Sequence, residues 1–408
     1  MSKLKIRLNI FFNIFYIILI MNTKTLNKSN SILFILIILF SSLLIPISYI
    51  DKRNTVASFK IDPHLKEKYG LQYPVTFKIE LSFTNMNVES VLKNGQRLEK
   101  ITINETDVEG WRKNANVVYV SFVLDPNTEI EIIANNGNSI PIRKCEPVDY
   151  YNNKKMAFIW SIDDYCSWLA DLFNSFHHSL RKRNFWITTA VVTSSMDRDG
   201  WEKLNRDVAK GKIEVASHSA THPNNIEDYL ERGLFYEINS SKNAIMDNLN
   251  LNPLFKYNET EYVPTWIEPS GYNHPIILNN LSLCDYLCDR STKRDRNAPK
   301  NKWDEKSSMY PVLPIDYCFE YNHQKSIAID KFNVGYEEGD AIHFFTHPQE
   351  IIDVSERDGS NTQFEDISFI VEFLESCGNK GDVWYSSMGA YYMYQYAMMK
   401  CNYEIILS

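Results

Sequence analysis

The sequence predicts an α/β protein: a distorted or incomplete β/α barrel, an N-terminal β-sandwich-like domain and an N-terminal membrane segment. Residues 29–50 carry no charge, residues 55–148 contain short alternating apolar runs, and from about 155 apolar runs alternate with longer amphipathic stretches. The last pattern is typical of parallel strands joined by helical crossovers, and roughly 250 residues suffice for a barrel. We therefore expect three parts, covering residues 1–50, 51–148 and 149–408.

The apolar run over 32–50 is long enough to cross a bilayer about 30 Å thick as a helix. A second span over 8–21, or a start of translation at Met21, stays open. No small-x-small cleavage site follows the run, which favours a retained signal anchor at the cell membrane over a cleaved signal and secretion. In both cases we expect the remainder of the chain outside the cytoplasm.

Composition is that of a globular protein, with 44% hydrophobic and 23% charged residues. The formal net charge of −8 and the lack of a basic stripe argue against a nucleic-acid partner, because binding phosphate needs clustered Lys and Arg. The seven cysteines include no CxxC pair, so we expect mostly buried thiols rather than a zinc finger or a dense disulfide framework.

The stretch 51–148 is predicted to be an antiparallel β domain. Alternating runs over 75–83, 116–124 and 128–134 are separated by Asn-, Gly- and Pro-containing turns. No acids, histidines or cysteines here have a catalytic spacing. A structural spacer is the favoured interpretation, and sugar binding through exposed rings is the alternative.

Chemically reactive side chains follow three predicted strands of the barrel. Asp163 and Asp164 close the strand 155–162, His218 and His222 follow the strand 212–217, and His347 follows the strand 341–346. Further repeats support the same pattern: a strand over 184–192 and helices over 166–183 and 200–210. Because the carboxyl ends of parallel strands meet at one edge, these residues are expected to converge there.

His218 and His222 are four residues apart, which on a helical turn places two imidazoles on one face, ready to hold a divalent metal. Taken alone, such a pair is more often two capping or surface histidines. The adjacent acids change this interpretation, because two carboxylates buried at a strand end need a cation or hydrogen-bond donors.

In this order, Asp163-Asp164, His218-Ser219-x-x-His222, a Pro269-x-Gly271 turn and His347 resemble the motifs of the polysaccharide deacetylases, carbohydrate esterase family four. The resemblance covers about residues 150–400. It implies a metal-dependent hydrolase, commonly with zinc, that removes N- or O-acetyl groups from a cell-surface or environmental glycan.

Carried over by position, the resemblance implies that Asp164, His218 and His222 hold the metal, which acidifies a bound water. It makes Asp163 the general base and His347 the acid that protonates the leaving group. The backbone N–H of Ser270 would stabilise the oxyanion in the turn formed with Pro269 and Gly271.

Two departures from the family pattern bear on activity. The family has Arg before the Pro of this turn, whereas Ile267 and Glu268 stand here, so either another cation tunes the base or none does. Tyr165 replaces the Gly that ends the first motif and is expected to narrow the site. Because of the missing Arg, a catalytically impaired glycan-binding module stays an alternative, as does a hydrolase of a non-sugar amide.

Several other residues have two interpretations. Trp266 and Tyr272 flank the turn and either stack on a sugar ring or pack beneath it. His343 is expected to be a packed core histidine, and His177 and His178 to be solvated. For the acid that supports the catalytic histidine, the candidates are Asp285 and Asp289.

Overall fold

A computed structural model describes residues 55–63, 72–83, 86–251, 256–257, 260–261, 263–271, 274–294, 312–315, 317–318, 325–351 and 368–407. The membrane segment predicted over 29–50 lies outside these ranges and stays a prediction. Within the described ranges, no helix has the length and apolar character needed to span a bilayer.

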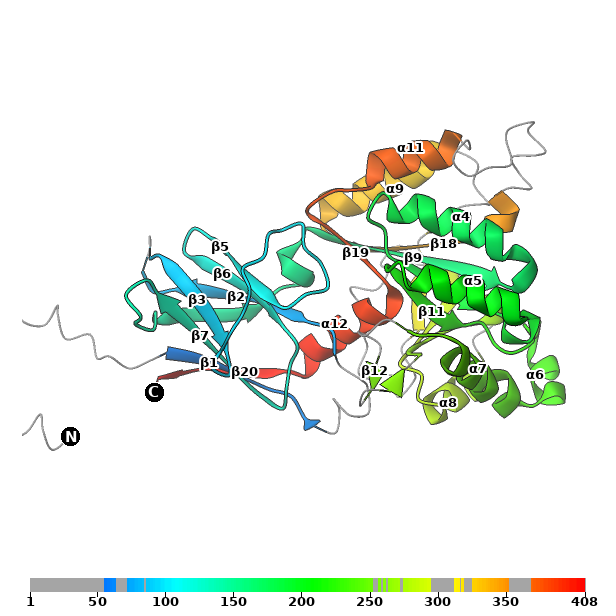
Figure 1. Ribbon diagram of the computed structural model, residues 1–408, viewed down its shortest axis with the longest axis horizontal. Coiled ribbons are helices and arrows are strands. Elements are labelled where there is room, and N and C mark those ends of the chain that lie inside the picture. The colour runs from blue at the N-terminus through cyan, green and yellow to red at the C-terminus, as the bar shows by residue number, and fades with distance from the viewer. Residues whose placement is uncertain are drawn as a thin grey trace, which may run out of the picture. The chain divides into compact units, whose positions relative to one another are not determined.

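The N-terminal region forms two antiparallel sheets, as the alternating pattern predicts (Figure 1). One has the order β20-β1-β7-β3-β4 and the other β5-β6-β2-β8. Their apolar faces share one core, in which the ring of Phe59 lies 4.4 Å from that of Phe77 and 4.9 Å from that of Phe122. The strands are β1 (Thr55–Lys60), β2 (Val75–Leu81), β3 (Val88–Lys93), β4 (Gln96–Arg97), β5 (Gly110–Asn114), β6 (Val117–Phe122), β7 (Asn127–Ala134), β8 (Ile142–Pro147) and β20 (Asn402–Leu407).

The last strand of the chain belongs to the first of these sheets. β20 pairs antiparallel with β1 over its whole length, from Thr55 opposite Leu407 to Lys60 opposite Asn402. The chain therefore returns to its N-terminal sheet after completing the parallel sheet. A fragment that starts near 150 would leave β20 without the strand it pairs with.

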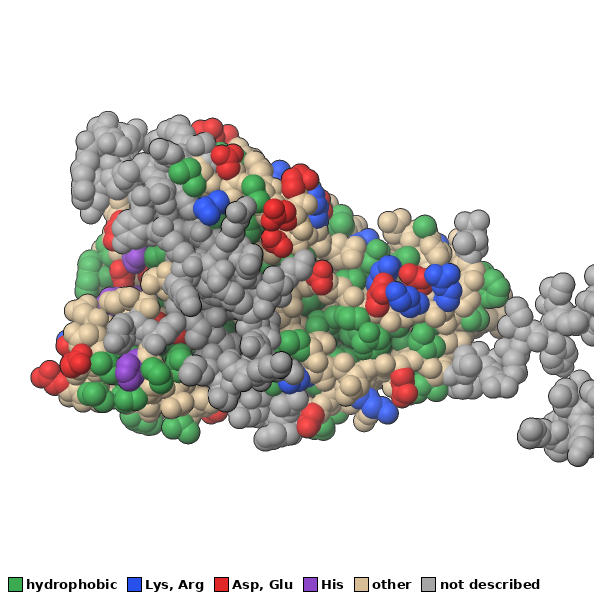
Figure 2. All heavy atoms as spheres, turned by 180° about the vertical axis from the view of Figure 1, so that it is seen from behind, with side chains coloured by type: hydrophobic (Ala, Val, Ile, Leu, Met, Phe, Trp, Pro, Cys, Tyr) green, Lys and Arg blue, Asp and Glu red, His purple; other side chains and the backbone are tan. Residues whose placement is uncertain are grey.

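Acidic and basic side chains lie side by side on the β-rich region (Figure 2). Two of the ion pairs join β2 to β8: Lys78 to Glu146 at 2.9 Å and Arg143 to Glu80 at 2.6 Å. Because exposed pairs of this kind contribute roughly 0–1 kcal/mol each, the stability of this region rests mainly on its apolar core.

The C-terminal part is a curled parallel sheet with the order β16-β15-β14-β11-β10-β9-β18-β17, and it confirms the predicted distorted or incomplete barrel. β18 pairs with one edge of β9. The other edge is shared, because β19 pairs with the first half of β9 and β10 with the second half. The strands are β9 (Met156–Tyr165), β10 (Ile187–Val191), β11 (Ile213–Ser217), β14 (Thr265–Ile267), β15 (Cys288–Arg294), β16 (Val312–Ile315), β17 (Tyr317–Cys318), β18 (Ala341–Thr346) and β19 (Val383–Ser386), with a separate hairpin of β12 (Lys256–Tyr257) and β13 (Thr260–Glu261).

Helices cover this sheet, whose central strands are buried on both faces as in other parallel sheets. Aromatic rings fill the layer between strands and helices; those of Trp160 and Phe373 lie 5.5 Å apart. The helices are α4 (Ala170–Arg181), α5 (Arg198–Val208), α6 (Ile226–Arg232), α7 (Ser241–Asn248), α8 (Pro275–Leu283), α9 (Lys325–Glu338), α11 (Ser368–Cys377) and α12 (Met388–Lys400). Six cysteines are buried and unpaired, as expected from their spacing: Cys145, Cys166, Cys284, Cys288, Cys377 and Cys401.

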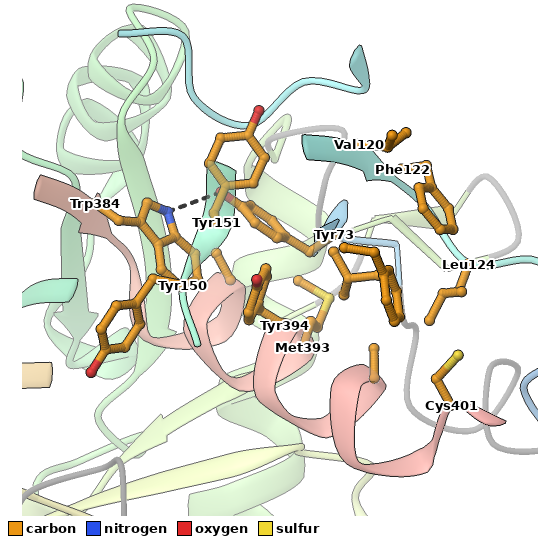
Figure 3. Close-up of a cluster of buried hydrophobic side chains, with 14 of the residues drawn as sticks. Tyr73, Val120, Phe122, Leu124, Tyr150, Tyr151, Trp384, Met393, Tyr394 and Cys401 are labelled. Atoms are coloured by element: carbon orange, nitrogen blue, oxygen red, sulfur yellow. Dashed lines mark hydrogen bonds between the residues drawn. The ribbon is translucent and has the colours of Figure 1, made fainter. Parts of the chain in front are cut away.

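Helix α12 connects the two regions. The buried carboxylate of Glu214 on β11 accepts a hydrogen bond from Gly389 N, at 2.8 Å, in the first turn of this helix. Farther along, Tyr394 packs 5.0 Å from the ring of Trp384, whose indole N–H donates to Tyr73 of the β-rich region at 3.1 Å (Figure 3). A shared aromatic core therefore joins the β-rich region to the barrel.

The prediction for His177 was wrong, whereas that for His343 is confirmed. His177 is fully buried on the apolar face of α4, with Nδ1 2.5 Å from Asp207 Oδ2 and Nε2 2.9 Å from Thr189 Oγ1. Helical spacing from Phe173 carries it inward, although the flanking charges suggest a solvated stretch. His343 is buried, with Nε2 2.9 Å from Ser161 Oγ.

Candidate metal centre

The carboxyl ends of β9, β11 and β18 bring the predicted side chains together. Asp163 and Asp164 lie among the last residues of β9, His218 follows β11, and His347 follows β18. Asp164 has a left-handed backbone with φ of 70°, and the register between β9 and β10 shifts at this point. Such an irregularity allows two consecutive carboxylates to be directed to one site instead of to opposite faces of the sheet.

Asp164, His218 and His222 form a cluster that fits a divalent metal. Their ligand atoms all lie within 4.8 Å of one another. Asp164 Oδ1 is 3.3 Å from His218 Nε2 and 3.4 Å from His222 Nε2. Two atoms each about 2.1 Å from one ion, at a tetrahedral angle, stand about 3.4 Å apart, so both distances suit a shared ion. One carboxylate and two imidazoles also leave room for a water and a substrate oxygen.

His218 is held in the tautomer that a metal ligand needs. Its Nδ1–H donates to the carbonyl oxygen of Ile267 on β14 at 2.7 Å, and the side chain is buried. In the neutral ring, Nε2 then carries the lone pair and faces Asp164. The β14 backbone thus fixes the ring orientation and the tautomer of this side chain.

The segment from His218 to His222 is a loop, and the helical turn predicted for it was wrong. Ser219 and His222 have left-handed backbones, with φ of 64° and 58°, and His222 N donates to Ser219 Oγ at 2.8 Å. The two imidazole rings converge, with centroids 4.8 Å apart. Glu237 supports the loop, because its carboxylate accepts hydrogen bonds from the backbone N–H and the hydroxyl of Thr221.

The electrostatics of the cluster favour an ionised carboxylate at Asp164 and a neutral imidazole at His222. Burial raises the pKa of Asp164, but hydrogen bonding to His218 and the nearby charges of His218, His347 and His222 outweigh it, so the pKa lies below its ordinary value. Burial, together with His218, lowers the pKa of His222. Both shifts favour the protonation states in which these groups bind a cation.

Asp163 has a guanidinium partner that its sequence neighbours do not supply. Arg290 on β15 is fully buried, and its guanidinium donates to Asp163 Oδ2 at 2.6 Å. The same guanidinium lies 4.6 Å above the ring of Phe345. Arg290 pairs in register with Ile267, so it reaches the site from the strand beside the Pro269 turn. Of the two alternatives left open for Asp163, the structure therefore supports the one in which another cation contacts it.

Glu268 stands where the family motif has Arg, and it serves the core instead of the base. It is fully buried and accepts hydrogen bonds from Trp266 Nε1 at 2.8 Å and Tyr229 OH at 3.0 Å. Burial, and then the charge of Asp289, raise the pKa of Glu268 well above its ordinary value. A neutral carboxyl here avoids placing a second negative charge beside the Arg290–Asp163 pair.

Two predicted substrate contacts are wrong because the side chains are fully buried. Trp266 packs against Tyr286, with ring centroids 5.5 Å apart, so it lies beneath the turn and cannot stack on a sugar. Tyr165 is directed into the core, with its ring 5.0 Å from that of Phe173 on α4. The irregularity at Asp164 interrupts the alternation of β9, so Tyr165 joins the face of Trp160 and Ile162 and not that of Asp163.

The Pro269–Gly271 turn has the tight geometry that its sequence suggests. Ser270 is left-handed with φ of 55°, and Gly271 has φ of 67°. A Cβ atom at Gly271 would lie 1.9 Å from Thr292 Oγ1, so a larger residue does not fit there. The oxyanion role of the Ser270 N–H stays a prediction, and Tyr272 lies outside the described residues.

His347 lies between the two carboxylates. Its Nε2 is 3.9 Å from Asp163 Oδ2 and 3.8 Å from Asp164 Oδ2. On its other side, Nδ1 is 3.9 Å from Glu350 Oε2. This geometry allows His347 to exchange a proton with a group held at the metal.

The carboxylate beside His347 Nδ1 is thus that of Glu350. It is neither of the two acids, Asp285 and Asp289, that the sequence offered for this role. Asp289 acts instead on Glu268 and Arg290, and Asp285 accepts a hydrogen bond from Lys242 Nζ through its carbonyl oxygen, at 2.9 Å. Glu350 follows His347 by three residues, a spacing that was visible in the sequence. Arg290 had no comparable local signal.

No protein-family model matches the sequence, and no curated protein matches it. Among solved structures the chain is similar to a 4-α-glucanotransferase from Thermococcus litoralis, with 12% identity and a TM-score of 0.40 over 58% of this chain and 40% of that one. It therefore spans less than half of that protein.

Members of carbohydrate esterase family 4 are also among the similar structures. One is the enzyme from Streptomyces lividans in complex with acetate, with 13% identity and a TM-score of 0.35 over 56% of this chain and 90% of that one. Another is a family 4 pseudoenzyme from Bacillus anthracis, with 13% identity and a TM-score of 0.35 over 59% of this chain and 66% of that one. The family that the motifs resemble is thus among the similar structures, but TM-scores this low carry no argument about function.

Proposed function

We propose that this protein is a metal-dependent deacetylase that hydrolyses acetyl groups, above all N-acetyl groups, on a glycan. The observation that carries the proposal is the convergence of a ligand cluster, an Arg-paired carboxylate and a histidine at one edge of the barrel. Asp164, His218 and His222 would hold a divalent ion, and we propose zinc because it binds nitrogen and oxygen ligands in such sets. When bound, such an ion polarises the acyl oxygen and acidifies water.

The residues of the chain perform the proton transfers. Asp163 accepts the proton of the attacking water, while Arg290 keeps its carboxylate oriented through the 2.6 Å hydrogen bond. His347 then donates a proton to the departing amine, and the carboxylate of Glu350 lies 3.9 Å from Nδ1 on the other side of the ring. The backbone N–H of Ser270 is the proposed donor to the developing oxyanion.

The alternative of a catalytically impaired glycan-binding module was motivated by the missing motif Arg. Arg290 removes that motive, since a guanidinium does contact Asp163. If the alternative held, glycan binding would persist after Asp163→Asn and the parent would release no amine. A hydrolase of a non-sugar amide would use the same residues and would differ only in the substrate it accepts.

The cellular setting is a further proposal and rests on the sequence alone. The uncharged segment 29–50 would anchor the chain in the cell membrane, with residues 51–408 on the extracytoplasmic side facing a surface or environmental glycan. Detection of the intact N-terminus in isolated membranes, with residues 51–408 accessible to added protease, would support this arrangement.

The test of the activity is amine release from N-acetylglucosamine oligomers by the full chain loaded with zinc. The full chain is needed because β20 pairs with β1. We expect release by the parent, and loss of release in both His218→Ala and Asp163→Asn. A parent that binds metal but hydrolyses neither N-acetyl nor O-acetyl sugars would overturn the proposed substrate class.

A further inference from the structure

Gln349 contacts the cluster from the turn after β18. It follows His347 by two residues, and its amide Nε2 donates to Asp164 Oδ2 at 3.1 Å. The opposite orientation of the amide would place its carbonyl oxygen against the carboxylate, where two acceptors repel. The chemistry therefore fixes the amide as the donor.

The two oxygens of Asp164 have different surroundings. Oδ1 lies 3.3 and 3.4 Å from the Nε2 atoms of His218 and His222. Oδ2 instead accepts from Gln349 and lies 3.8 Å from His347 Nε2. Only Oδ1 thus lies close to the Nε2 atoms of both imidazoles.

We propose that Gln349 is a positioning residue that keeps Asp164 a ligand through one oxygen. With Oδ2 occupied by the amide, Oδ1 and the two imidazoles would hold the ion and would leave room for water and substrate. A hydrogen-bonded partner behind a ligating carboxylate also fixes its orientation before the ion arrives. The inference rests on the metal centre proposed above.

The other end of the Gln349 amide does not contribute to the stability of the fold. Its Oε1 is buried and has no hydrogen-bond partner among the described residues. An unsatisfied buried polar atom is unfavourable for folding, and an apolar side chain would avoid it. Violations of this kind are expected where a side chain serves a site and not the stability of the fold.

The experiment compares zinc affinity of the full-length parent with Gln349→Met, which keeps the length of the side chain but removes the donor. Affinity is measured by competition with a chromogenic chelator. We expect zinc binding about 10–100-fold weaker in the variant. Gln395→Met is the matched control, since Gln395 donates to the carbonyl of Asp149 elsewhere in the chain, at 2.9 Å, and its loss should leave zinc affinity unchanged.

Gln349→Asn is a second variant, because it retains the amide but is too short to reach Asp164, and the same weakening is expected. The visible spectrum of the cobalt(II) form gives an independent readout: binding through both carboxylate oxygens raises the coordination number and lowers the absorption. Folded variants with parent-like zinc affinity and an unchanged cobalt spectrum would overturn the role of Gln349. A parent that binds no zinc would instead overturn the metal centre itself.

Discussion

The two halves of the site are built in different ways. On the metal side, Asp164 lies near the end of β9, His218 directly follows β11, and His222 comes from the same loop as His218. On the base side, Asp163 depends on Arg290, a residue of a strand whose sequence, CDRSTKR, shows no apolar strand pattern. Metal ligands can therefore be inferred from short motifs, whereas the partner of a base depends on which strands lie next to each other.

Around Asp163, the acidic and basic residues stand at other positions than in the family motif. The motif position before Pro269 holds the acid Glu268, while the guanidinium is supplied by Arg290 on the adjacent strand. Because β14 and β15 are neighbours in register, a guanidinium from either strand can reach the same carboxylate. Loss of a motif residue is thus weak evidence for loss of activity until neighbouring strands have been considered.

The largest effect is expected on the metal side. Removal of the ion by a chelator, or His218→Ala, should reduce amine release on the order of 1,000-fold or more, because polarisation of the acyl oxygen and acidification of water are lost together. Readdition of zinc should restore the chelated parent but not the variant. Restoration of both by zinc would mean that His218 is not a ligand.

Asp163→Asn separates the two halves of the site. It should lower kcat by about 10²–10⁴-fold, the range for loss of a general base, while zinc affinity stays close to that of the parent. Isothermal titration with zinc alongside the kinetic assay distinguishes this result from loss of the ion. A large fall in zinc affinity would place Asp163 among the ligands instead.

Arg290→Met should affect both stability and activity. It leaves the buried carboxylate of Asp163, 3% exposed, without its guanidinium, and breaking a buried pair in this way costs about 3–5 kcal/mol. Denaturant unfolding of the metal-free proteins measures this loss. Arg290→Lys, which keeps the charge but not the planar donors, should fall between the parent and Arg290→Met. Equal stability of all three would show that the pair does not form.

The smallest expected effect is on pH dependence. Burial raises the pKa of Asp289 to about 7, above its unfolded value, so folding favours its protonated form. The stabilisation from this group is complete below the unfolded pKa, about 4, and is lost as pH rises through about 7. Asp289→Asn, which cannot ionise, should show a smaller fall in Tm between pH 4 and 7 than the parent does. Parallel Tm profiles would contradict a raised pKa.

The sequence predicted the elements that have strong periodicity. The strands predicted over 155–162, 184–192 and 212–217 correspond to β9, β10 and β11, because short runs rich in apolar residues between amphipathic helices suit parallel strands buried on both faces. The positions of Asp163, Asp164, His218 and His347 at the strand ends followed from the same reasoning. The local backbone conformation could not be predicted in this way, since the left-handed conformations of Ser219 and His222 leave no pattern in the sequence.

Side-chain direction and long-range pairing account for the remaining errors. Trp266 and Tyr165 lie close in sequence to the proposed functional residues, yet both are buried, Tyr165 because the irregularity at Asp164 interrupts the alternation of β9. Arg290 depends on the register of β15 with β14, and Gln349 on the fold of the turn after His347. Neither contact has a fixed spacing in the chain, so motif analysis could not find it.

The central claim is that one site combines a metal cluster with a separate, Arg-paired base. The most direct test measures amine release from N-acetylglucosamine oligomers and zinc binding together, on the full-length parent and Asp163→Asn. The predicted result is equal zinc binding, with release at least about 100-fold slower in the variant. Release by the variant at the parent rate, or no release by a zinc-loaded parent, would contradict the account.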